Sequence, residues 1–167
     1  MLAKIVLFLF PAAMAYAAAS DLLTMRISNR LVLAMVAGFL LVALLMNMSW
    51  QDFGMHLATG AVVLAATFTF FAFGWIGGGD AKLAAATALW LGFSTTLPYL
   101  VYASLLGGML TFLLLAVRRH PLPTQVMNIT WIRRLHDKST GVPYGIAMAA
   151  AGLLTYSNTA IYQHFAS

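Results

Sequence analysis

The chain has 167 residues, of which 62% are hydrophobic and 8% are charged, and its formal net charge is +5. Soluble globular domains carry roughly 25% charged residues, so this composition excludes one and indicates a multi-pass membrane protein. The few basic residues flank apolar runs, which favours membrane topology over a nucleic-acid-binding surface as their explanation. We therefore expect no nucleic-acid partner.

Two residue types that carry much enzyme chemistry are missing from the chain. It contains no cysteine and no glutamate. Disulfides, thiol nucleophiles and cysteine-ligated zinc are therefore excluded. The side-chain carboxylates are Asp21, Asp52, Asp80 and Asp137. Any acid–base pair must come from these four aspartates.

Six apolar runs follow one another along the chain and predict an all-α integral membrane protein. The predicted spans are 2–20, 31–48, 55–74, 81–96, 98–117 and 144–162. Most loops between them are short, so we expect a single membrane-embedded domain over 1–167, without a sizeable soluble part. Spans that are distant in the sequence must then build any functional site.

The first run could instead be a cleavable signal peptide, because it has Lys4 at its head and an alanine-rich end. The distribution of basic residues argues against that alternative. If the run is retained with its N-terminus outside, segments 20–30, 75–82 and 118–143 face the cytoplasm. Eight of the nine basic residues then lie inside, namely Arg26, Arg30, Lys82, Arg118, Arg119, Arg133, Arg134 and Lys138. This obeys the positive-inside rule, so we predict six spans with both termini outside.

The predicted topology assigns each of the four aspartates to one side of the membrane. Asp21 and Asp80 share the cytoplasmic boundary, whereas Asp52 lies in the outer loop. Asp137 falls in the long basic loop, where we expect a solvated charge. Two carboxyl groups that come close share a proton. One can then activate water against a peptide carbonyl while the other donates a proton, and because such a pair titrates as a unit we assign neither role to one residue.

Other hydrolytic mechanisms fit the residue types poorly. A zinc site of the His-Glu-x-x-His kind is excluded by the missing glutamate, and no Gly-x-Ser-x-Gly turn is present. The histidines show no ligand spacing, and we expect them at interfacial or loop positions: His56, His120, His136 and His164. We therefore expect neither a metal nor another cofactor.

The stretch Gly77-Gly78-Gly79-Asp80 places a carboxylate between two apolar runs. Ionisable groups at such a position are usually functional, and glycines beside them let another chain approach closely. With Lys82, the stretch resembles the GxGD signature of membrane aspartyl proteases. Lys82 could influence the aspartates or bind substrate, or it could serve only as a topology anchor.

Two further motifs narrow the resemblance to type IV prepilin peptidases. Asp21 with Ile27 and Asn29 resembles the first-aspartate motif of that family. Asn29 could support the site by a hydrogen bond or simply cap the second span. A third match resembles the element that opens the last span in those enzymes, and it consists of Pro143, Tyr144 and Gly145.

The resemblance implies an intramembrane aspartyl endopeptidase with Asp21 and Asp80 as catalytic residues. Such an enzyme removes a short basic leader from prepilin or pseudopilin precursors, just before their hydrophobic helix. The implied location is the bacterial inner membrane, with the active site on the cytoplasmic side and lipid as a further partner. Longer relatives also methylate the new N-terminus and carry paired Cys-x-x-Cys motifs. Since this chain has no cysteine, it resembles the short forms of tight-adherence pilus systems, and we expect no methyltransferase activity.

Three alternatives remain open on the sequence. A small proton- or cation-coupled transporter could use the same two aspartates, although it would favour acids nearer the bilayer midplane. A purely structural subunit of a pilus assembly would leave the paired motifs unexplained. A preflagellin peptidase would differ only in its substrate. The oligomeric state is not predicted.

Overall fold

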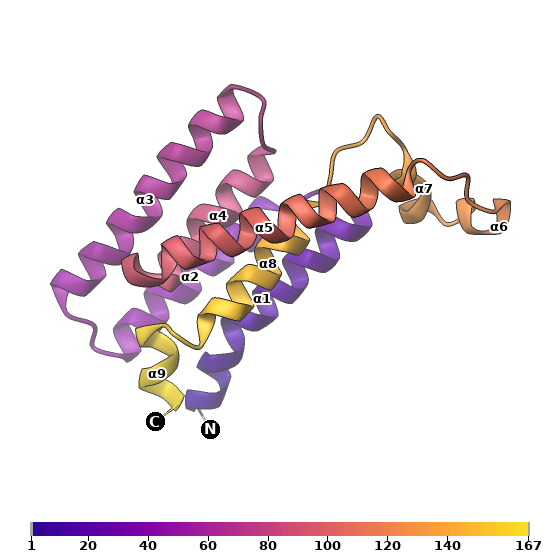
Figure 1. Ribbon diagram of the computed structural model, residues 1–167. Helices are drawn as coiled ribbons and strands as arrows, with labels where there is room; N and C mark the ends of the chain where they lie inside the picture. The colour runs from indigo at the N-terminus through magenta and orange to yellow at the C-terminus, as the bar shows by residue number, and fades with distance from the viewer. Residues whose placement is uncertain (1, 167) are drawn as a thin grey trace.

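The computed structural model describes residues 2–166, so the two end residues of the expected domain 1–167 lie outside it. Within that range the chain is helical and contains no strand (Figure 1). The helices are α1 (Leu2–Thr24), α2 (Asn29–Leu45), α3 (Trp50–Ala72), α4 (Gly78–Leu91), α5 (Phe93–Val117), α6 (Thr124–Met127), α7 (Thr130–His136), α8 (Tyr144–Tyr156) and α9 (Ala160–Ala166). This confirms the all-α class.

Three of these helices are long and apolar enough to cross a membrane: α1, α3 and α5. A crossing needs about 20 apolar residues. By contrast α2 has 17 residues, α4 has 14 and α8 has 13. Among the described residues, length and composition therefore support three of the six predicted spans.

The shortness of α4 follows from its central position. It packs against α2, α3, α5 and α8. From Leu83 to Leu91 all of its residues are buried. A helix that is apolar on every side is one that protein covers. Since α4 contacts protein rather than lipid, its length need not match the bilayer, and its N-terminus can present Asp80 inside the bundle.

The predicted spans 81–96 and 98–117 were divided at the wrong place. The break falls at Gly92, which has φ +72 and separates α4 from α5. Glycine adopts this left-handed backbone conformation without the steric penalty that a Cβ atom brings. Pro98 consequently lies inside α5 and not in its first turn.

The last predicted span, 144–162, is also interrupted. Helix α8 ends at Tyr156 and α9 begins at Ala160. The Thr159 hydroxyl accepts a hydrogen bond from the backbone N–H of Tyr162 at 3.1 Å, as an N-cap residue does. A cap in the middle of an apolar run thus splits the run into two helices.

His56 is not the interfacial or loop residue that the sequence suggested. It is buried in α3, and its Nδ1 atom lies 2.7 Å from the Leu89 carbonyl oxygen. A Cβ atom at Gly92 would lie 2.8 Å from the His56 ring. The histidine therefore packs against the break between α4 and α5 and has a structural role there.

Three connections gather at the end of the molecule opposite the chain termini (Figure 1). They are the turn 25–28, the segment 73–77 and the long connection 118–143, which contains α6 and α7. This arrangement brings the C-terminal end of α1 together with the N-terminal ends of α4 and α8. Those three helix ends carry the motifs recognised in the sequence.

Candidate active site

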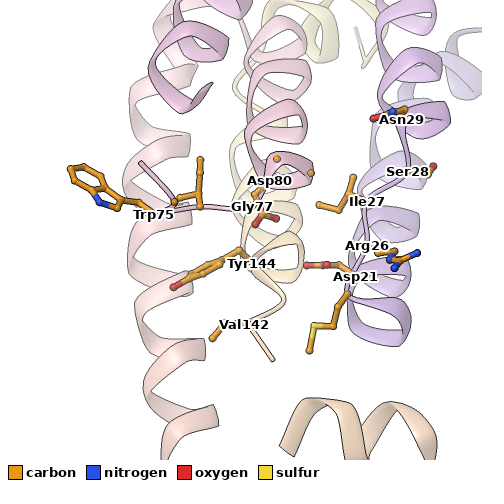
Figure 2. Close-up of a pocket in the computed structure, with 16 residues that line it drawn as sticks. Asp21, Arg26, Ile27, Ser28, Asn29, Trp75, Gly77, Asp80, Val142 and Tyr144 are labelled. Atoms are coloured by element: carbon orange, nitrogen blue, oxygen red, sulfur yellow. The ribbon is translucent and has the colours of Figure 1, made fainter. Parts of the chain in front are cut away.

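Asp21 and Asp80 line the same cavity, although they are 59 positions apart in the sequence. The cavity has a volume of about 720 Å³ and lies where α1, α4 and α8 meet. Figure 2 shows Asp21 extending from the α1 side toward Asp80 and Tyr144, which belong to the facing elements. The structure therefore brings the two aspartates of the predicted pair together.

Asp21 is held by a contact from the far end of the sequence. Its Oδ2 atom accepts a hydrogen bond of 2.7 Å from the backbone N–H of Gly145. Gly145 is the second residue of α8, whose N-cap residue, Pro143, forms no side-chain cap. The first N–H groups of a helix lack partners within it and attract negative charge. The Asp21 carboxylate thus caps the N-terminus of α8 and is only 5% exposed.

The close contact between Asp21 and α8 requires a glycine at position 145. A Cβ atom there would lie 2.8 Å from Oδ2, 3.0 Å from Cβ and 3.1 Å from Cγ of Asp21. The Cβ atom, which the backbone fixes, cannot move away unless α1 itself moves. Gly145 therefore fixes how closely α8 approaches the aspartate.

Residues that neighbour Asp80 in the sequence determine its position. It lies in the first turn of α4, whose N-cap residue is Gly77. A carboxylate in the first turn of a helix interacts favourably with the helix dipole. A Cβ atom at Gly77 would lie 2.9 Å from Asp80 Oδ2 and 3.7 Å from Cγ, so the glycine leaves space for the carboxylate.

Gly79 brings the turn after α1 close to α4. A Cβ atom at this glycine would lie 3.2 Å from Cβ of Ile27. Helix α1 ends at Thr24, and Met25 follows with φ 54, a left-handed conformation that turns the chain at a helix C-terminus. This turn and the glycine together place the first-aspartate motif beside the GxGD motif.

Lys82, a predicted site residue, does not line the cavity. Its Nζ atom donates a hydrogen bond of 3.0 Å to Oδ1 of Asn29, and its side chain is exposed. Asn29 itself lines the cavity. The N-cap of α2 is Ser28, whose hydroxyl accepts from the backbone N–H of Leu31, so Asn29 is not the cap. The contact between Lys82 and Asn29 joins α4 to the start of α2.

Tyr144 forms part of the cavity wall. Its hydroxyl lies 3.1 Å from Oγ1 of Thr111 on α5. Its ring packs against Gly107, where a Cβ atom would lie 3.1 Å from the ring carbons. Pro143 is buried just before it, at the N-cap position of α8. The third sequence motif therefore supplies the wall, the helix start and the donor to Asp21.

Several residues of the cavity were not predicted from the sequence. Arg26 lies in its wall, although its charge indicated a topology anchor. Trp75 and Ile76 also line it, directly before the glycine run. A tryptophan just before the predicted GxGD motif was a usable sequence signal. No sequence signal pointed to Gly141 and Val142, which line the cavity because the connection 118–143 folds back over it.

Arg118 fastens that connection to the helix bundle. It is buried at the end of α5, with 7% of its surface exposed. Its guanidinium group donates hydrogen bonds to the carbonyl oxygens of Leu135, Thr140 and Gly141, at 2.8, 3.2 and 2.9 Å, and to the Thr140 hydroxyl at 3.2 Å. Buried arginine is stable only when its donors are satisfied, as here. Arg118 therefore holds the segment that leads into the cavity wall.

The other two aspartates have local partners. Asp52 lies in the first turn of α3 and accepts a hydrogen bond of 2.7 Å from the Ser49 hydroxyl. Asp137 is exposed in the long connection, and hydrogen bonds from the backbone and then the side chain of Ser139 hold its pKa below its usual value. It thus stays ionised at neutral pH and makes no contact with the cavity.

The groups in the cavity that can exchange protons with a substrate are the carboxyl groups of Asp21 and Asp80. Two nearby carboxylates do not both ionise readily, so one of them can hold a proton while the other accepts one. Among residues 2–166 no three histidine, cysteine, aspartate or glutamate side chains come close enough to bind a metal ion. The arrangement suits general acid–base catalysis of hydrolysis.

Comparison with known proteins gives one match. Neither the curated proteins nor the solved structures contain a match to this chain. A family model described as the type IV leader peptidase family matches residues 8–112, a stretch that includes Asp21 and Asp80 but ends before Tyr144. Since this match covers more than half of the 167 residues, the chain belongs to the type IV leader peptidase family.

Proposed function

We propose that this protein is an intramembrane aspartyl endopeptidase that removes the short basic leader of prepilin or pseudopilin precursors. The observation that carries the proposal is the shared cavity of Asp21 and Asp80. The chain has four side-chain carboxylates, and these two lie on helices that are distant in the sequence. The chain also belongs to the type IV leader peptidase family. Proton exchange between them explains why a membrane protein should bring two acids together.

The proposed reaction needs no covalent intermediate. The ionised carboxyl group takes a proton from water as the water oxygen attacks the carbonyl carbon of the scissile peptide bond. The protonated carboxyl group donates its proton to the carbonyl oxygen. The carboxyl group that took the proton from water then passes it to the amide nitrogen as the C–N bond breaks, and a hydroxyl proton of the intermediate returns to the other carboxylate as the new terminal carboxyl group forms. The Gly145 N–H holds the Asp21 carboxylate in place throughout. The pair acts as one titrating unit.

We further propose a single domain of six membrane-embedded helices with both termini outside the bacterial inner membrane. The basic residues support this orientation, because the turn 25–28 and the connection 118–143 lie at the same end of the molecule (Figure 1). The cavity then opens at the cytoplasmic side, where a precursor presents its basic leader. We propose that the protein lacks methyltransferase activity, since it carries no Cys-x-x-Cys pair.

Cleavage of a precursor panel by purified protein in liposomes tests the proposal. Asp21→Asn and Asp80→Asn should each lower kcat/KM by about 10² to 10⁴, because each removes one partner of proton transfer. Asp52→Asn and Asp137→Asn are matched controls outside the cavity and should cleave at the wild-type rate. Asparagine at position 21 can still accept the Gly145 N–H, so the fold should survive, which thermal unfolding would verify.

Two results would count against the proposal. Near-normal cleavage by either Asp21→Asn or Asp80→Asn would contradict the paired mechanism. If the wild type left every precursor intact but moved protons across the liposome membrane, the two aspartates would instead serve a transporter.

A further inference from the structure

A second cavity adjoins the first and shares part of its wall. Its volume is about 290 Å³. Trp75, Ile76, Asp80 and Tyr144 line both cavities. Figure 2 labels three of these residues where they surround the space near the start of α4. Asp80 therefore lies where the two cavities meet, so a chain bound across the catalytic pair would extend into both.

The two cavities differ in chemistry. The first is lined by glycines and by charged or polar side chains such as Asp21 and Arg26, together with apolar side chains such as Ile27. The second is lined chiefly by apolar or small side chains, among them Phe70, Ala84, Leu100, Ala103 and Met148. The hydroxyl of Ser104, also in the second cavity, donates to the Leu100 carbonyl of its own helix and needs no further partner. The second cavity is therefore suited to apolar groups.

Helices α3 and α5 form the two sides of the second cavity. Helix α3 packs mainly on α4, and α5 packs mainly on α8, with few direct contacts between α3 and α5. Figure 1 shows these two helices diverging toward the end that carries the α3–α4 connection. Phe70 on α3 and Ser104 on α5 are exposed at the sides of the cavity. An apolar segment can thus reach it sideways, from the lipid.

The size of the second cavity limits what it can hold. One turn of a helix about 10 Å across and 5.4 Å long fills roughly 400 Å³, which is of the same order as the volume of the cavity. The cavity therefore accommodates the side chains of one helix face, or a short extended stretch. Small residues in its wall, Ala84 and Ala103, let that segment approach closely.

We propose that this second cavity, between α3 and α5, binds the apolar segment that follows the cut in the precursor. The inference rests on the proposed function. The leader lies in the first cavity beside Asp21, the scissile bond lies between the two aspartates, and the apolar segment contacts Ala103 and Ser104. Side-chain size at position 103 then governs how bulky that segment can be.

Disulfide cross-linking tests this placement directly, because the natural chain contains no cysteine. The probe is a prepilin-type precursor with a single cysteine in the first two helical turns after the cut. The enzyme carries Asp21→Asn, which keeps the precursor intact, together with Ser104→Cys. The matched control is Ala116→Cys, an exposed position on the same helix outside the cavity. We expect at least about fivefold more cross-linking at position 104.

A cavity-filling variant supplies a second readout. Ala103→Phe should lower kcat/KM for the full precursor about tenfold, while Ala116→Phe should change it less than twofold. A shortened precursor that ends a few residues after the cut should be affected less than twofold by either variant. A folding defect would lower cleavage of both substrates, so the difference between them reports binding of the apolar segment.

The outcomes separate this inference from the proposed function. Equal cross-linking at positions 104 and 116, with normal cleavage by the wild type, would overturn the placement of the apolar segment alone. The placement would also be overturned if Ala103→Phe lowered kcat/KM equally for the full and the shortened precursor while cross-linking at positions 104 and 116 was equal. If the wild type cleaved no precursor, the proposed function would fail, and this inference with it.

Discussion

The surroundings of Asp21 and Asp80 differ in how they hold a carboxylate. Both carboxylates lie at the N-terminus of a helix, where the unpaired N–H groups favour negative charge. Asp80 lies at the start of its own helix, α4. Asp21 lies at the end of α1 and caps a different helix, α8, through the Gly145 N–H at 2.7 Å.

This difference means that neighbouring residues in the sequence position Asp80, whereas a tertiary contact between distant helices positions Asp21. Asp80 and its flanking glycine, Gly77, are three residues apart, so they take their positions as soon as α4 forms. Asp21 reaches its position only when α8 docks against α1. Perturbing the Asp21 side should therefore disturb packing as well as chemistry, whereas perturbing the Asp80 side should disturb chemistry with less effect on packing.

Among substitutions that leave both aspartates in place, the largest effect is expected from Gly145→Ala. The new Cβ atom would meet Asp21 at Oδ2, Cβ and Cγ, within 2.8 to 3.1 Å, so α8 must move away. A displacement near 1 Å can lower the rate about 10²-fold, and overpacking costs about 1 to 3 kcal/mol. Precursor cleavage measures the loss of rate, and thermal unfolding measures the loss of stability. Gly108→Ala is the control, because nothing lies within 4 Å of its new Cβ atom. Wild-type activity in Gly145→Ala would refute the tight contact.

A smaller effect is expected from Gly77→Ala on the Asp80 side. Here the new Cβ atom would meet mainly the carboxylate oxygen Oδ2 at 2.9 Å, while Cγ is 3.7 Å away. Because the carboxylate can rotate, we expect about a tenfold loss of kcat/KM and little change in the unfolding temperature. A loss of stability as large as that of Gly145→Ala would contradict the distinction between the two halves.

Arg118→Lys tests the Asp21 side from a distance. Lysine is a single point charge and cannot reproduce the four hydrogen bonds of the guanidinium group. We expect faster amide hydrogen exchange over 135–142 and a loss of kcat/KM of about fivefold, since loosening this segment frees one cavity wall. Arg119→Lys, at an exposed position, is the matched control. Unchanged exchange would show that Arg118 does not hold the segment.

The smallest effect is expected from Lys82→Met. The exposed hydrogen bond between Lys82 and Asn29 would be lost, and such bonds contribute about 0.5 to 1 kcal/mol. Because Lys82 does not line the cavity, kcat/KM should fall by no more than about threefold. A hundredfold loss, with a normal unfolding temperature, would instead show that the lysine contacts the substrate.

Local sequence predicted the Asp80 half of the site better than the Asp21 half. The glycine run, the carboxylate and the start of α4 are neighbours in the chain, so their arrangement follows from helix geometry. The expected helix boundaries failed at Gly92 and near Thr159, where a left-handed glycine and a capping hydroxyl interrupt apolar runs. A hydropathy profile alone cannot predict such helix breaks, because the residues on both sides of each break are equally apolar.

The sequence alone indicated a helical membrane protein. It also singled out the two aspartates that lie in motifs and showed the resemblance to prepilin peptidases. Composition and residue order suffice for these, since they concern partition into lipid and local backbone preference. Only the tertiary structure decided that Gly145 binds Asp21, that Lys82 faces Asn29 instead of the cavity, and that a second cavity meets the first at Asp80. Those facts depend on how helices far apart in the chain pack together, which no local pattern specifies.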